Sequence, residues 1–173
     1  MSKKLPIHIF IVSTDKTFTN QMVQNLEIET DYFVFQYSSG EEFSNDTIYN
    51  PIPPNAIPII IVDYELKSLD RPDAKDGLTI LSEIKSEQPR WQVITFSDSS
   101  LKKVKNDALA LGAYCHIFKN ENTFARLKAK IHEIENEEAF KKQKKITFYA
   151  ILSFLGITLI LLLVAFLLYI FEQ

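Results

Sequence analysis

The feature that most constrains the fold is a long run without a charged side chain, the 26 residues 146–171. As a helix this run would rise roughly 39 Å at about 1.5 Å per residue, and the hydrocarbon core of a bilayer is about 30 Å thick. A helix buried in the core of a globular domain is usually shorter than this. The run therefore predicts one transmembrane helix and leaves the residues before it to form a separate domain.

The charges on the two sides of this run predict its orientation. Four lysines precede it, at positions 141, 142, 144 and 145, and Glu172 and Gln173 follow it. Because short segments rich in Lys and Arg stay on the cytoplasmic side, the N-terminal domain is expected in the cytoplasm. The chain is then a single-pass protein of the cytoplasmic (inner) membrane, with its lysines beside anionic lipid headgroups of the bilayer.

Composition excludes several classes of protein. Residues 1–140 contain 15 Lys and Arg against 21 Asp and Glu, a net charge of −6, which argues against a nucleic acid partner. The single cysteine excludes a disulfide scaffold and a zinc module. The four glycines are too far apart to form a phosphate-binding loop of a nucleotide enzyme.

Before residue 133, apolar runs alternate with amphipathic stretches. The runs at 7–12, 57–62 and 92–96 are apolar on both faces, as expected of central parallel strands covered by helices. Further apolar runs lie at 32–37 and 115–119, and helical patterns lie at 17–28, after Gly40, at 77–87, at 99–111 and from 122 onward. The order is therefore (βα)5. This order predicts a doubly wound α/β domain with a five-stranded parallel sheet.

In such a sheet, ligands bind at the carboxyl ends of the strands. Asp63 follows the third run, Ser97 the fourth and Lys119 the fifth. A carboxylate, a hydroxyl and an ammonium at one sheet edge can act on a phosphoryl group: Asp63 as the nucleophile, Ser97 as a hydrogen-bond donor and Lys119 as the neutralising charge.

The segments IIIVDYEL, DGLTILSEIK, VITFSD and ALALGAYCHIFKN together resemble, in order and spacing, the receiver domain of bacterial two-component response regulators. The resemblance covers roughly residues 6–132 and implies a flavodoxin-like fold. It implies that Asp63 is the phosphoacceptor, that Ser97 and His116 occupy the switch positions, and that Lys119 is the lysine of the phosphorylation site. It also implies Mg²⁺ as a cofactor and a sensor histidine kinase or another signalling protein as the partner.

One departure concerns the metal site. Ser13 and Thr14 stand where the family has an acidic pair, which leaves Asp63 and the backbone carbonyl of Glu65 as the implied ligands. Asp15 and the Glu65 side chain are the possible substitutes.

Two functions remain open at this stage. The chain is either a membrane-anchored receiver of a phosphorelay that accepts phosphate on Asp63, or a pseudo-receiver that acts as an adaptor or scaffold without phosphotransfer. A hydrolase is disfavoured because no second carboxylate or histidine at a strand end can serve as a base. We therefore expect no enzyme activity beyond self-phosphorylation and slow self-dephosphorylation. The expected organisation is a receiver-like domain at 1–132, a charged helical connector at 133–145 and a transmembrane helix at 146–171.

Overall fold

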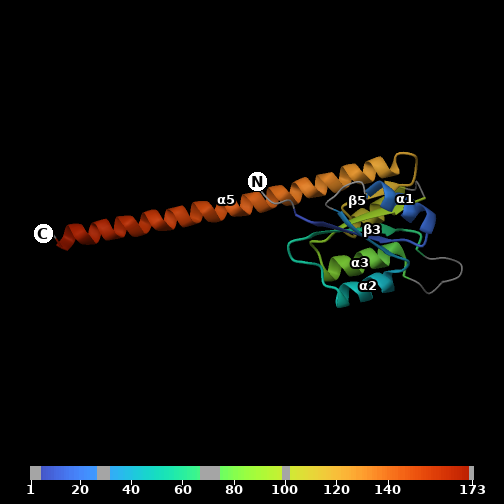
Figure 1. The fold of residues 1–173 in the computed structure, drawn as a ribbon, viewed down its shortest axis with the longest axis horizontal. Helices are drawn as coiled ribbons and strands as arrows, with labels where there is room; N and C mark the ends of the chain where they lie inside the picture. The colour runs from blue at the N-terminus through green and yellow to red at the C-terminus, as the bar shows by residue number, and fades with distance from the viewer. Residues whose placement is uncertain (1–4, 27–31, 67–74, 99–101, 172–173) are drawn as a thin grey trace. The chain divides into compact units, whose positions relative to one another are not determined.

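A computed structural model describes residues 5–26, 32–66, 75–98 and 102–171, and the chain divides into two compact units, Met1–Glu135 and Asn136–Gln173. The first unit contains a parallel sheet with strand order β2-β1-β3-β4-β5. The strands are β1 (Ile7–Val12), β2 (Tyr32–Tyr37), β3 (Ile57–Asp63), β4 (Gln92–Ser97) and β5 (Cys115–Phe118). The predicted five-stranded parallel sheet is confirmed (Figure 1).

Helices alternate with the strands along the chain. They are α1 (Lys16–Leu26), α2 (Gly40–Tyr49), α3 (Gly77–Glu87), α4 (Lys102–Ala110) and α5 (Thr123–Phe171). The predicted helices at 17–28 and 99–111 extend over residues 27–28 and 99–101, which lie outside the described residues. In the part that is described, the helix and strand types agree with the sequence prediction.

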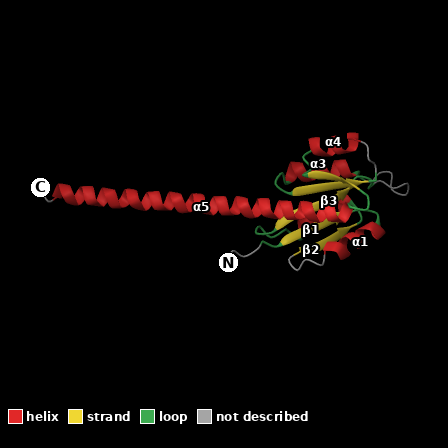
Figure 2. Ribbon diagram, turned by 90° about the horizontal axis from the view of Figure 1, so that it is seen from above, coloured by secondary structure: helices red, strands yellow, loops and turns green. Residues whose placement is uncertain are grey.

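Two apolar layers hold the sheet between the helices, as expected of a doubly wound fold (Figure 2). On one face, odd-numbered residues of β1 and β3 pack against α1 and the first turns of α5, including Met22, Leu127 and Ile131. On the other face, even-numbered residues of the same strands pack against α2, α3 and α4, including Phe43, Leu81 and Ala108. Because β1, β3 and β4 are buried on both sides, their apolar runs are continuous.

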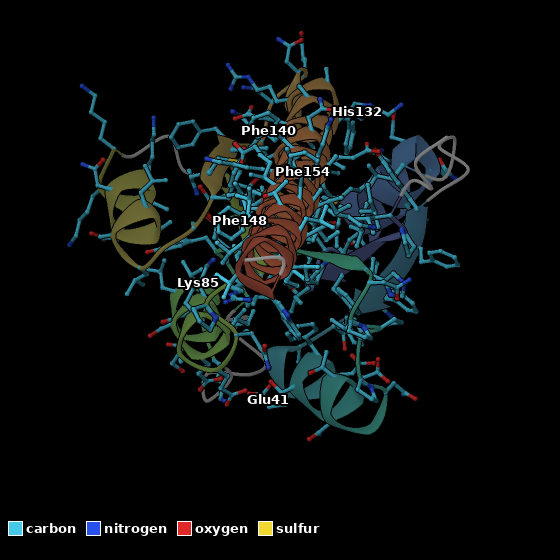
Figure 3. All side chains as sticks on the ribbon, turned by 90° about the vertical axis from the view of Figure 1, so that its left-hand side faces the viewer. Glu41, Lys85, His132, Phe140, Phe148 and Phe154 are labelled. Carbon is cyan, nitrogen blue, oxygen red and sulfur yellow. The ribbon has the colours of Figure 1, made fainter. Side chains whose placement is uncertain are left out.

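The second unit consists of the remaining residues of α5. Many of the apolar side chains described in this unit are exposed, among them Phe140, Phe148 and Phe154, which Figure 3 labels along the helix. Among the described residues, one helix is long and apolar enough to cross a membrane, by length and composition only.

Candidate functional site

Asp63 lies at the carboxyl end of β3 and is almost completely buried, with 1% of its surface exposed. Its Oδ2 atom accepts a hydrogen bond from the Ser13 hydroxyl at 2.9 Å and lies 3.3 Å from the Lys119 ammonium. Its Oδ1 atom accepts the backbone N–H of Glu65 at 3.1 Å. The Asp63 charge is thus compensated by one cation and two neutral donors.

The expected site residues Ser13, Asp63 and Lys119 therefore lie together. Ser13 directly follows β1, the neighbour of β3, so its side chain meets the Asp63 carboxylate at the same sheet edge. Thr14 and Asp15 are exposed. Asp15 Oδ1 accepts the backbone N–H of Phe18 at 3.0 Å, which makes it a capping residue at the start of α1.

Lys119 is positioned by both charge and aromatic contacts. Its ammonium lies 3.1 Å from the exposed carboxylate of Asp98 and 5.2 Å from the ring centroids of both Phe18 and Phe96. Burial acts to lower the pKa of Lys119, but the charges of Asp63 and Asp98 outweigh it and raise the pKa above its usual value. Lys119 therefore remains a cation. It bridges two carboxylates, and the sequence analysis had not predicted the contact with Asp98.

Glu65 contacts the same edge of the sheet through its side chain. Its Oε2 atom accepts the backbone N–H of Asp98 at 3.3 Å. Burial raises the pKa of the Glu65 carboxyl; the Asp98 N–H opposes this shift, and the nearby Asp63 adds to it. Glu65 thus connects the loops after β3 and β4.

Ser97 and His116 form a second hydrogen-bonded group. The Ser97 hydroxyl lies 3.0 Å from His116 Nε2, and the Thr95 hydroxyl lies 2.8 Å from His116 Nδ1. Both hydroxyl residues are buried, and burial together with the charge of Lys105 lowers the pKa of His116. The imidazole therefore joins two hydroxyls of β4 as a neutral ring. Thr95 was not among the predicted site residues, although it lies opposite His116 in the strand register.

The donors around Asp63 do not fit the magnesium site that the resemblance implies. Mg²⁺ prefers a near-octahedral shell of oxygen ligands with one or two carboxylates. Here a serine hydroxyl and a lysine already contact Asp63 Oδ2, and Asp15 is used as a helix cap. Among the described residues, no group of three or more His, Cys, Asp or Glu side chains could hold a metal ion.

A parallel (βα)5 sheet with an aspartate, a serine and a lysine at the ends of β3, β4 and β5 defines a receiver-type signalling domain. The profile of the response regulator receiver domain matches residues 9–132. The chain therefore belongs to the receiver domain family of two-component signalling.

Solved structures share this fold. A receiver domain protein (CheY-like) from Methanospirillum hungatei superposes with a TM-score of 0.64 at 21% identity, over 79% of this chain and 98% of that one. The receiver domain of a LuxO repressor protein from Vibrio parahaemolyticus has a TM-score of 0.65 at 18% identity, over 80% of this chain and 96% of that one. A chain of the CheX-CheY-BeF3-Mg²⁺ complex from Borrelia burgdorferi has a TM-score of 0.62 at 22% identity, over 75% of this chain and 90% of that one. A comparison with curated proteins gave no match.

Proposed function

We propose that this chain is a membrane-anchored pseudo-receiver, a protein-interaction module that works without phosphotransfer to Asp63. The observation that carries the proposal is the hydrogen bond from the Ser13 hydroxyl to Asp63 Oδ2. A phosphoacceptor must present a carboxylate oxygen to phosphorus while cations neutralise the phosphoryl oxygens. Ser13 and Thr14 stand where the family has an acidic pair, and the Lys119 ammonium lies 3.3 Å from Asp63 Oδ2.

The arrangement of Ser97 supports the same proposal. The Ser97 hydroxyl lies 3.0 Å from His116 Nε2, so a hydroxyl that donates to this nitrogen is engaged by the ring and not by a phosphoryl group on Asp63. Because both groups are buried or half-buried, breaking this contact without a replacement is unfavourable. Ser97 therefore stabilises one conformation of the end of β4.

In this proposal the protein is not an enzyme, and its output is through protein contacts. The partner is a sensor histidine kinase or another signalling protein. Two leucines at the C-terminal end of α4 and directly after it, Leu109 and Leu111, are exposed and offer apolar contact area. The net charge of −6 over residues 1–140 disfavours nucleic acid as a partner.

We also propose that residues 146–171 anchor the protein in the cytoplasmic membrane. The receiver domain at 1–132 then lies in the cytoplasm, and the connector at 133–145 brings its lysines to the lipid surface. The exposed apolar side chains of this part of α5 support the anchor, because water is a poor environment for them.

A second candidate function is phosphoacceptance on Asp63. The convergence of Asp63 and Lys119, at 3.3 Å, favours it, since a lysine in this position can neutralise a developing phosphoryl charge.

One experiment separates the two candidates. The full chain in detergent is incubated with millimolar Mg²⁺ and either acetyl phosphate or beryllofluoride. Intact mass and backbone amide chemical shifts are then recorded, with Asp63→Asn as the blank. We expect no phosphoryl adduct and no shift of amides near position 63. The double variant Ser13→Asp with Thr14→Asp, which restores the acids, is expected to respond. An adduct on the unmodified chain that Asp63→Asn abolishes would establish phosphoacceptance instead.

A further inference from the structure

The outer strand β2 has an unprotected edge. Edge strands are usually protected from other chains by charged side chains, proline or bulges. The sequence of β2, YFVFQY, contains no charged residue, proline or glycine, and among the strands that the structure describes β1 is its only neighbour. Figure 2 shows β2 at the margin of the sheet. Its composition is therefore typical of a central strand, which is hydrogen-bonded to a neighbouring strand on each side.

An aromatic cluster covers one face of this edge. Phe33 and Phe35 are 54% and 38% exposed. The ring of His8 lies 5.0 Å from Phe33 and 5.7 Å from Phe35, and the ring of Phe10 stacks on Phe35 at 5.1 Å between centroids. Burial lowers the pKa of His8, so this ring is neutral at neutral pH. Four aromatic rings thus form one cluster, in which the rings of Phe33 and Phe35 are open to solvent.

The backbone of β2 has a defined direction at this edge. The Ser13 N–H donates to the Tyr37 carbonyl at 3.0 Å, so the polar backbone groups of Tyr37 face β1. Because the backbone groups of a strand alternate in direction, those of Phe35 and Phe33 also face β1, and those of Val34 and Gln36 face outward. In the part of the chain that the structure describes, the Val34 and Gln36 backbone groups have no outer strand to pair with.

We propose that β2 is the interface between two copies of this chain, which pair antiparallel about a two-fold axis through Val34. In this register the two Val34 residues exchange two backbone hydrogen bonds, which requires the outward direction found for Val34. Phe33 then lies opposite Phe35 of the second copy, in the closer pair type that has no hydrogen bonds between its backbones. Both exposed phenyl rings become cross-strand aromatic pairs on one face.

The occupant is a second copy because β2 is self-complementary. An isologous interface requires each contact to occur twice, with the two residues exchanged between the copies. In the order Phe33, Val34, Phe35, a two-fold axis through Val34 places each phenylalanine opposite a phenylalanine of the other copy. The outward direction of the Val34 backbone groups is also consistent with an axis at this residue. Shifting the register by two residues in either direction would leave an exposed phenyl ring without a phenyl partner.

Disulfide trapping in the full chain tests this register. In a Cys115→Ser background, Val34→Cys places two thiols in a backbone pair about 5.5 Å apart between Cα atoms, within the range that a disulfide spans. Gln36→Cys is the matched control, since it is on the same face and more exposed. In the proposed register the two Gln36 residues lie roughly 13 Å apart along the strands, which is too far.

We expect a cross-linked dimer from Val34→Cys and none from Gln36→Cys after mild oxidation in membranes or detergent. Replacing Cys115 removes the one native thiol, whose pKa burial raises to about 11. If Val34→Cys gives no dimer, or if both variants cross-link equally, the proposal is overturned.

A second variant pair distinguishes β2 from the leucines of α4. Adding Phe33→Lys to the Val34→Cys chain introduces a charge twice into the dimer, and we expect the cross-linked yield to fall by about tenfold or more. Leu109→Lys changes a similarly exposed side chain on α4 and should leave the yield unchanged. If Leu109→Lys lowers the yield and Phe33→Lys does not, the two copies meet through α4 and the β2 interface is excluded.

Discussion

Ser13 decides how the charge of Asp63 is compensated. The Ser13 hydroxyl lies 2.9 Å from the buried Asp63 carboxylate, and the Lys119 ammonium lies 3.3 Å from the same oxygen. A carboxylate in place of the hydroxyl would put two like charges within hydrogen-bonding distance of one another. We therefore expect an aspartate at this position to need a divalent cation that the serine does not need.

The first prediction concerns Ser13→Asp. We expect this variant to be less stable than the unmodified chain in EDTA, by about 1–3 kcal/mol, because a donor is replaced by a like charge. Millimolar Mg²⁺ should restore much of the loss through binding to the folded state. Urea unfolding with and without Mg²⁺ measures both effects. Ser13→Ala is the control, since it should lose stability without gaining any response to Mg²⁺.

His116 leads to a prediction about pH. Its pKa is lowered in the folded state, so between that pKa and about 6.5 the unfolded chain binds more protons. The stability that neutral His116 contributes is therefore complete above about pH 6.5 and decreases as the pH falls toward the folded pKa. Urea unfolding across this range should show a steeper loss for the unmodified chain than for His116→Gln.

His8 supplies the comparison for that measurement, because burial lowers its pKa too. His8→Gln should therefore remove a separate part of the same pH dependence. If His116→Gln has the same pH dependence as the unmodified chain, the bridge between Thr95 and Ser97 does not control this titration.

At the scale of elements, α3 begins directly against the end of β3. A Cβ atom on Gly77, the first residue of α3, would overlap the Asp63 carbonyl oxygen and lie 2.8 Å from Tyr64 Cα. Both are backbone atoms, so neither can rotate away. The preceding Asp76 caps the helix by accepting the Thr79 N–H at 2.8 Å. The helix start thus fixes the backbone that carries Asp63.

We therefore predict that Gly77→Ala destabilises the protein by about 1–3 kcal/mol through overpacking. Chemical denaturation measures the loss, and amide shifts around Asp63 should change as well. Gly40→Ala is the matched control at the start of α2. Its added methyl would meet the side chain of Ile80, which can adopt another rotamer, so its cost should be smaller.

Most elements of the fold could be predicted from the sequence because their signals are local. The strands β1, β3 and β4 are apolar runs with clear ends, and the doubly wound arrangement follows from burial on both faces. The aromatic edge of β2 could not be predicted in the same way. Its pattern indicated a strand, but the exposure of Phe33 and Phe35 depends on the place of β2 in the strand order, which is a property of the packed domain.

The candidate site shows the same division. The placement of Asp63, Ser97 and Lys119 follows from the rule that parallel strands end at one edge. The hydrogen-bond and ion-pair partners of these residues do not follow from that rule, because each side chain can reach several nearby groups in different rotamers. Lys119 could be assigned to Asp63 from the sequence, but its second contact, with Asp98, depends on the path of the loop after β4.

At the scale of the whole molecule, the chain joins an acidic domain to a basic and then apolar helix. The exposed lysines at 141, 142, 144 and 145 directly precede the apolar residues. Each lysine near an anionic membrane surface contributes about 1 kcal/mol of attraction, which salt screens. The lysines and the apolar residues can thus hold the protein at a membrane in two separable ways.

The prediction at this scale compares two truncated chains. Residues 1–145 should leave the membrane fraction of cells but still bind anionic lipid vesicles in low salt. The same fragment with the four lysines replaced by glutamine should not bind. Vesicle co-sedimentation at increasing ionic strength measures the difference. Retention of both fragments in cell membranes would show that residues 146–171 are not the anchor.

The aromatic enclosure of Lys119 has a further consequence for its chemical reactivity. Its side chain is 11% exposed, and its ammonium lies over the rings of both Phe18 and Phe96, 5.2 Å from each centroid. Reagents that acylate amines should therefore modify the lysines of α4 and of the connector long before this one. Slow acylation of Lys119 indicates that Phe18 and Phe96 cover its side chain. A partner or a solution condition that uncovers Lys119 should increase its acylation rate in the intact protein.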